Sequence, residues 1–387
     1  MKRALPIVPA IIVFLLLFPV ARPVEGSGDT FQFWYAGHLA VTGRSVYDVA
    51  EWQRAGPEYG HIAGNVARNC SDRGRAECTW LYPPLTAWLF APFGVVAPPA
   101  GTLLVDALVL LTTLAGVIAA AVAFGPREPR VLALLLTVAV AAHPFVVNIR
   151  AGHFVGLLLL GLAAVALGLR AHRALPLAVG ATVLALKAHL FVVLAPAVAL
   201  RLGFERRWRE MAIAGGVPAL LVTIALARSP DAISAIVSGS AGKSGIAWST
   251  PAAVAAAVAP SAPLAVFVLI IAVSSFAAAR AIAAEEQRRD HVVIAATCAL
   301  SLIVTPYAQP YDLLLLVPAF ALVADAAARL AQPRRTLLLA AMVVAYLVAP
   351  WAGLIVGSGQ ALGRAIYGTT PVIALLLLAV RPPTRDR

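Results

Sequence analysis

The sequence predicts an all-α polytopic membrane protein, because of its composition, its low charge content and the spacing of its apolar blocks. Of the 387 residues, 61% are hydrophobic and only 12% are charged, whereas a soluble domain has about a quarter charged residues. The apolar residues recur in blocks of about 15 to 25, the length that crosses a hydrocarbon core of about 30 Å. These figures exclude a water-soluble enzyme and a disordered chain, and they argue against a nucleic-acid partner.

The apolar blocks predict about 12 transmembrane helices, within a range of about 10 to 13, in one integral-membrane domain over residues 1–387. The first block, residues 4–21, follows Lys2 and Arg3 and lacks a clear small-residue cleavage site, which favours an uncleaved helix over a signal peptide. The other expected spans are 101–124, 131–146, 154–169, 175–187, 189–200, 211–227, 252–279, 291–305, 312–328, 336–350 and 368–380.

The basic residues indicate the orientation of these spans. When the spans alternate, most of the 30 Lys and Arg residues fall on one side, in short connectors such as 200–210 and at both termini. Short loops rich in Lys and Arg stay in the cytoplasm. We therefore expect a multi-pass protein of the plasma (inner) membrane with cytoplasmic N- and C-termini, in contact with membrane lipids.

Residues 22–79 form the longest polar stretch and predict a large first extracytoplasmic loop. Cys70 and Cys78 lie in it and could form a disulfide in an oxidising compartment, whereas Cys298 lies in an apolar block, as a small core residue does. The next block, 81–97, contains several prolines, so we expect a juxtamembrane or re-entrant segment rather than a full span.

The block 175–200 is too long for one comfortable span and carries Lys187 and His189 in its middle. Two half-length helices that turn at residues 187–189 fit this pattern best. One tilted helix with a buried lysine is the alternative.

On this topology, ionisable and aromatic residues collect on the extracytoplasmic side. Charged groups at membrane depth are costly, so they are functional candidates. A carboxylate can take a proton from a hydroxyl nucleophile, and Arg, Lys and His can hold a phosphate. A lipid-linked sugar phosphate would bring its phosphate to this depth, and no ligand cluster for a metal is evident. The candidates are Asp29, Tyr82, Arg150, His153, Lys187, His189, Tyr311 and Asp312.

Five short segments, in this order along the chain, carry a resemblance to a known family. They are residues 29–48, Tyr82-Pro-Pro, Arg150-Ala-Gly-His-Phe, Leu186-Lys-Ala-His and Thr305-Pro-Tyr-Ala-Gln-Pro-Tyr-Asp. Together they resemble glycosyltransferase family 87, which has the GT-C fold and includes polyprenyl-phosphate-mannose-dependent α-mannosyltransferases and some arabinofuranosyltransferases. His153 and Ala188 depart from the pattern, since members often have Gln and Pro there.

The resemblance implies an inverting transfer of a mannose-like or pentose sugar, without a cofactor, from a polyprenyl-phosphate donor to a hydroxyl of a lipid or cell-envelope glycan acceptor. Asp29 would be the catalytic base, and the other candidates would contact the substrates. Structural roles stay open: Asp29 as a helix cap, Lys187 snorkelling to the interface, Tyr311 and Asp312 at a helix start, and Tyr82 as an interface aromatic.

A transporter or flippase of lipid-linked sugar intermediates is the alternative function, because the same cations could hold a headgroup without a positioned base. No internal repeat is visible, which weighs against transport. A catalytically inactive scaffold for envelope-polysaccharide synthesis is a third possibility.

Overall fold

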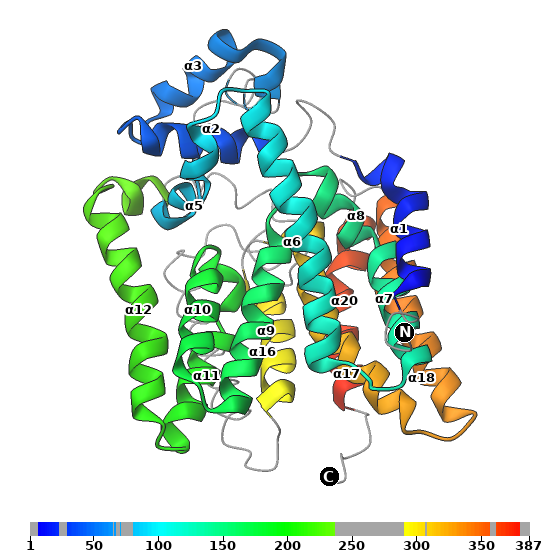
Figure 1. The fold of residues 1–387 in the computed structure, drawn as a ribbon. Coiled ribbons are helices and arrows are strands. Elements are labelled where there is room, and N and C mark those ends of the chain that lie inside the picture. Colours follow the sequence, from blue (N-terminus) through cyan, green and yellow to red (C-terminus); the bar gives the residue numbers. More distant parts are fainter. Residues whose placement is uncertain are drawn as a thin grey trace.

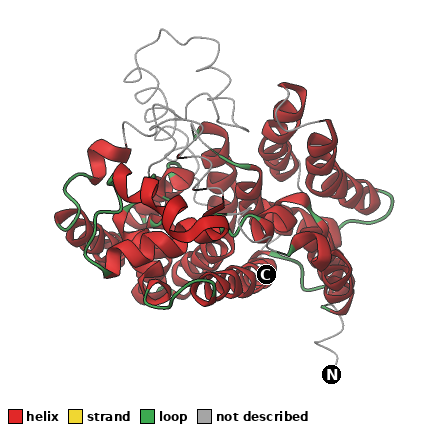
Figure 2. Ribbon diagram, turned by 90° about the horizontal axis from the view of Figure 1, so that it is seen from above, coloured by secondary structure: helices red, strands yellow, loops and turns green. Residues whose placement is uncertain are grey.

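The computed structural model describes residues 7–22, 29–64, 66, 70, 80–236, 290–305, 308–356 and 361–379. These residues form helices and their connections, and no strand occurs among them (Figure 2). The predicted all-α class is therefore confirmed. The expected span 252–279 and Cys78 lie outside the described residues. Cys70 is disulfide-bonded.

The helices pack as an elongated bundle with a smaller group of helices at one end (Figure 1). Their order is α1 (Val8–Ala21), α2 (Thr30–Val41), α3 (Val49–Tyr59), η1 (Gly60–Ala63), α5 (Pro84–Gly94), α6 (Ala100–Phe124), α7 (Pro129–Ala141), α8 (His143–Arg150), α9 (Val155–Ala171), α10 (Ala174–Ala185), η3 (Ala188–Phe191), α11 (Leu194–Phe204), α12 (Trp208–Ala227), α16 (Asp290–Val304), η5 (Pro310–Leu316), α17 (Val317–Ala328), α18 (Arg334–Val343), η6 (Val344–Val348), α19 (Ala349–Val356) and α20 (Ala361–Ala379).

Four helices of the described residues are long and apolar enough to cross a membrane: α6, α12, the run Pro310–Ala328 and the run Arg334–Val356. The pair α7 and α8, bent by 48°, would make a fifth span. Most of the other expected spans appear as shorter apolar helices of 10–17 residues, among them α1, α9 and α10. These helices indicate a membrane protein, but they do not establish 12 spans.

The described part of residues 22–79 is a packed helical group rather than an extended loop. Helices α2, α3 and α5 lie together at the upper end of the bundle in Figure 1. The α3 helix begins where the Asp48 side chain accepts a hydrogen bond from the Ala50 N–H, which satisfies one free donor of the first turn. Helix α5 has only 11 residues, which agrees with a segment too short to be a full span.

Helices α2 and α5 cross so closely that only glycine fits on either side. A Cβ on Gly37 would lie 2.2 Å from the Phe90 carbonyl oxygen, and one on Gly94 would lie 2.2 Å from the His38 nitrogen. A hydrogen bond from the Trp34 indole N–H to the Val96 carbonyl oxygen, at 2.9 Å, reinforces the same contact. The crossing fixes α2, and with it the segment that follows Asp29.

A second glycine crossing joins α6 to α9. A Cβ on Gly116 would lie 2.2 Å from the Gly156 carbonyl oxygen, and one on Gly156 would lie 2.2 Å from the Thr113 Cα. The Asn148 side-chain amide donates to the Thr113 hydroxyl at 2.8 Å. The connector between α8 and α9 is therefore held against α6 on both of its sides.

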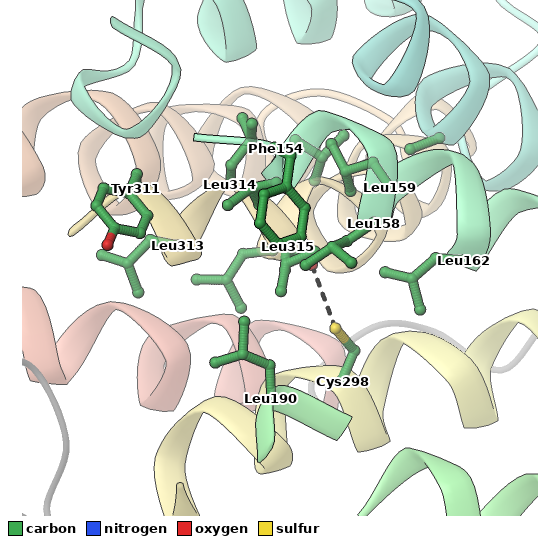
Figure 3. Close-up of a cluster of buried hydrophobic side chains, with 14 of the residues drawn as sticks. Phe154, Leu158, Leu159, Leu162, Leu190, Cys298, Tyr311, Leu313, Leu314 and Leu315 are labelled. Atoms are coloured by element: carbon green, nitrogen blue, oxygen red, sulfur yellow. Dashed lines mark hydrogen bonds between the residues drawn. The ribbon is translucent and has the colours of Figure 1, made fainter. Parts of the chain in front are cut away.

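An apolar cluster from α9, η3, η5 and α16 lies next to this connector (Figure 3). Its members include Phe154, Leu158, Leu159, Leu162, Leu190, Cys298, Leu313, Leu314 and Leu315. Cys298 is buried and not in a disulfide, and its Sγ lies 3.5 Å from the Leu315 carbonyl oxygen. Cys298 is thus the small core residue that its apolar surroundings predict.

The chain breaks at Lys187, as the length of the block 175–200 predicts. Helix α10 ends at Ala185, and Lys187 has φ −142° and ψ 55° before η3 and α11 follow. One continuous tilted helix is therefore wrong, although the lysine is indeed buried. The Thr86 hydroxyl donates to the Leu186 carbonyl at 2.9 Å, which satisfies a backbone group that the break releases.

We predict that Gly37→Ala destabilises the protein by about 1–3 kcal/mol, because the added methyl group must push α2 and α5 apart. The measurement is thermal unfolding of the purified protein in detergent. Gly215→Ala in α12 is the matched control, since no described atom beyond its own helix backbone lies within 4 Å of its Cβ position, and it should be neutral or stabilising. Equal melting temperatures for the two variants would contradict the prediction.

Candidate active site

The site lies where four helices begin or break. Asp29 is the N-cap residue of α2, His153 lies between α8 and α9, Lys187 lies between α10 and η3, and Tyr311 and Asp312 belong to η5. These positions are far apart in the sequence, but their side chains are in contact. The structure thus brings together five of the eight predicted site residues.

Asp29 and His153 form a hydrogen-bonded pair. The Asp29 Oδ2 atom lies 2.8 Å from the His153 Nε2 atom, and the side chains are 31% and 1% exposed, respectively. The Asp29 backbone N–H also donates to the Ala151 carbonyl at 2.7 Å. The Asp29 side chain makes no capping hydrogen bond to α2, so the carboxylate is held by the histidine and open on its other side.

The surroundings of His153 favour the neutral imidazole. Its complete burial is the largest influence and lowers its pKa, and the nearby Lys187 charge lowers it further against the opposing effect of Asp29. A neutral ring that donates Nε2–H to Asp29 carries a bare Nδ1, and within the described residues this buried Nδ1 has no hydrogen-bond partner. An unpartnered acceptor nitrogen fits that tautomer.

Lys187 and Asp312 form a fully buried ion pair. The Lys187 Nζ atom lies 2.6 Å from the Asp312 Oδ1 atom, and the two side chains are 1% and 0% exposed. The other carboxylate oxygen accepts the Gln309 backbone N–H at 2.8 Å and completes a capping box. Lys187 therefore does not snorkel to an interface, and Asp312 does mark the start of a helix.

Tyr311 joins the two pairs. Its ring stacks on the His153 ring with centroids 3.7 Å apart and an angle of 21° between the planes. The Lys187 Nζ lies 4.9 Å from the centroid of the same Tyr311 ring, within the range of a cation–π contact. The contacts run without interruption from Asp29 to Asp312.

Tyr82 lies at the edge of this group, within an aromatic wall. Its ring centroid is 6.4 Å from that of His153, 5.4 Å from that of Phe33 and 5.7 Å from that of Phe154. The Tyr82 carbonyl accepts a hydrogen bond from the Tyr47 hydroxyl at 2.7 Å. Its half-buried ring therefore faces the site rather than standing alone at an interface.

Two predicted residues lie outside this contact chain. Arg150 is exposed at the end of α8, and no hydrogen bond or ion pair of its side chain occurs within the part of the chain that the structure describes. His189 is half-buried in η3, two residues from Lys187. No group of three His, Cys, Asp or Glu residues that could hold a metal is found among the described residues.

Sequence reasoning missed Asp106, the only acidic residue of α6. The Thr30 hydroxyl donates to its Oδ1 at 2.7 Å. Gly152, with φ +71°, lies close to the same hydroxyl. A Cβ at this position would lie only 2.1 Å from the Thr30 Oγ1, so only glycine fits there. Asp106 thus anchors the residue next to Asp29, and its place inside an apolar span was the signal that could have revealed it.

We predict that Thr30→Val destabilises the protein by about 1–3 kcal/mol, since it leaves the half-buried Asp106 carboxylate without its hydrogen-bond donor. Thr30→Ser keeps the hydroxyl and is the matched control. Thermal unfolding in detergent compares the two variants. Indistinguishable melting temperatures would show that the Thr30–Asp106 hydrogen bond does not contribute to stability.

The comparisons with known proteins identify the family of the chain. The sequence model of glycosyltransferase family 87 matches residues 80–306, which is more than half of the 387-residue chain. The match includes Tyr82, Arg150, His153, Lys187 and His189, and the remaining site residues flank it. No curated protein and no solved structure matches the chain. The chain belongs to glycosyltransferase family 87 and is a membrane glycosyltransferase.

Proposed function

We propose that the protein transfers a mannose-like or pentose sugar from a polyprenyl-phosphate donor to a hydroxyl of a lipid or cell-envelope glycan acceptor. The observation that carries this proposal is the Asp29 carboxylate, which is partly exposed and bound on one oxygen by the buried His153. A general base needs this combination of fixed orientation and access to the proton it removes.

In the proposed step, Asp29 takes the proton of the acceptor hydroxyl while the acceptor oxygen attacks the anomeric carbon. The bond from the acceptor oxygen to that carbon forms as the bond to the phosphate oxygen breaks, and polyprenyl phosphate leaves. Retention of configuration would require a second carboxylate as nucleophile. Asp312 is buried against Lys187, and Asp106 is bound to Thr30, so a single inverting displacement suits the site.

We assign the donor phosphate to Arg150. Its exposed guanidinium precedes His153 by three residues, and a guanidinium can bind two phosphate oxygens at once. Lys187 is a poorer candidate than the sequence suggests, because its charge is compensated by Asp312. Tyr82 and His189 lie beside the site and would contact the sugar or the acceptor.

The basic connectors predict that this site faces the extracytoplasmic side of the plasma membrane, with both termini in the cytoplasm. A polyprenyl tail would then stay in the bilayer while its phosphate reaches the edge of the helical bundle. A flippase of lipid-linked sugars would use the same cations but would not need a positioned base.

We predict that Asp29→Asn lowers kcat by about 100- to 10,000-fold with little change in donor affinity, because the base acts on the acceptor proton. The assay measures sugar transfer from a polyprenyl-phospho-sugar in vesicles. Asp48→Asn is the matched control: Asp48 is an exposed carboxylate of the same helical group, and Asn caps a helix equally well. Full activity of Asp29→Asn would contradict the assignment and favour the flippase.

We also predict that Arg150→Gln raises the donor KM at least about tenfold, because one bidentate contact to a charged phosphate is lost. Its effect on kcat should be small by comparison. Arg22→Gln replaces another exposed arginine and should behave as the unaltered protein does. If Arg150→Gln changed only the acceptor dependence, the donor phosphate would have to bind elsewhere.

A further inference from the structure

We propose that Lys187, Tyr311 and Asp312 are positioning residues that hold the His153 ring in place, rather than residues that bind the substrate. We call these three residues the support cluster. The inference rests on the proposed role of Asp29 as the base, because His153 is the residue that orients Asp29. It reassigns three residues for which the sequence predicts contact with the donor or acceptor.

The burial of Lys187 and Asp312 is the first argument against a role in substrate binding. Lys187 and Asp312 are 1% and 0% exposed, so a substrate phosphate would have to displace one buried partner to reach the other. Withdrawing Lys187 would leave the Asp312 carboxylate as an uncompensated charge in an apolar surrounding, which is strongly unfavourable. The pair is therefore suited to a fixed structural role and poorly suited to binding and releasing a substrate in every turnover.

The Tyr311 ring links the buried ion pair to the His153 imidazole, which is the second argument for a positioning role. It contacts both the His153 ring, with centroids 3.7 Å apart, and the Lys187 ammonium, which is 4.9 Å from its centroid. The buried ion pair therefore restrains the tyrosine ring, and the same ring stacks on the imidazole. With the ring plane restrained, the Nε2–H points at the Asp29 carboxylate.

The backbone around the support cluster is anchored by further side chains. The Thr86 hydroxyl binds the Leu186 carbonyl oxygen, and the Ser301 hydroxyl oxygen accepts the N–H groups of Val193 and Leu194 at 3.0 and 3.3 Å. On the other side, Asp312 itself accepts the Gln309 N–H. The described backbone on either side of the support cluster is thus anchored by side-chain hydrogen bonds, as a positioning role requires.

The first test compares Lys187→Met, Asp312→Asn and the double variant, with donor and acceptor kinetics measured for each. Either single change should lower kcat at least about tenfold with donor KM within about threefold of the unaltered value, because one buried charge is left alone and the Tyr311 ring shifts. The double variant removes both charges, so its kcat should exceed that of either single variant.

A phosphate-binding Lys187 gives the opposite pattern. Lys187→Met would then raise the donor KM, Asp312→Asn would not, and the double variant would resemble Lys187→Met. That result would overturn the inference. The Glu128–Arg335 ion pair, which is partly exposed and joins other helices, supplies the control: Glu128→Gln with Arg335→Met should leave all kinetic constants unchanged.

The second test keeps both charges and does not depend on folding of the charge variants. Tyr311→Phe preserves the stacked ring and should retain kcat within about threefold, whereas Tyr311→Leu removes the stack and should lower kcat with donor KM unchanged. A raised donor KM in Tyr311→Phe would mean that the hydroxyl binds the donor, and it would overturn the inference.

A spectroscopic readout separates this inference from the proposed function. In protein labelled with ¹⁵N-histidine, the resonance of the His153 Nε2–H tautomer is assigned by its loss in His153→Gln. It should persist in Tyr311→Phe and shift or broaden in Tyr311→Leu, and an unchanged signal in Tyr311→Leu would overturn the inference. Because this measurement needs no substrate, it tests the positioning of the His153 ring even if the protein does not use a polyprenyl-phospho-sugar.

Discussion

The buried ion pair between Lys187 and Asp312 is the interaction on which the arrangement of the site depends. It joins residues 125 positions apart, at 2.6 Å, with both side chains almost completely removed from solvent. Removing one partner of such a pair costs about 3–5 kcal/mol, because the other charge stays buried. The pair therefore holds the break after α10 against η5, and neither segment can move without the other.

Every residue of the contact chain lies at a helix start or break, and this has a physical cause. Within a regular helix, the backbone N–H and C=O groups bond to each other, so they need no side chains as hydrogen-bond partners. At a break, freed N–H and C=O groups need partners, and here Thr86, Ser301 and Asp312 supply them. Asp312, one of these polar residues, also binds the side chain of Lys187.

Much of the fold could be predicted from the sequence, because the apolar blocks form helices and prolines begin several of them, among them α7, α8 and α17. The break at Lys187 followed from the length of its block and a charge in its middle. The number of spans could not be settled, since several blocks form helices that are short and bent, such as α7 and α8.

The site residues could be found one by one, but not their partners. Asp29 and His153 are 124 positions apart, and their pairing depends on the positive φ of Gly152 and on the contact of the Asp29 N–H with Ala151. Lys187 and Asp312 looked like two separate ligands, although they neutralise each other. Asp106 was missed because a single acid in a long apolar helix has no short motif around it.

The distribution of charge distinguishes Asp29, the proposed base, from the residues proposed to support it. Lys187 and Asp312 cancel each other in the interior, and His153 is neutral, so the contact chain keeps a single net charge on Asp29. That charge lies at the exposed end, where its carboxylate is 31% exposed. In the proposed transfer, an acceptor hydroxyl would meet one fixed carboxylate, Asp29. The donor phosphate would be bound by Arg150 at the exposed edge, because the only cation of the contact chain is already neutralised by Asp312.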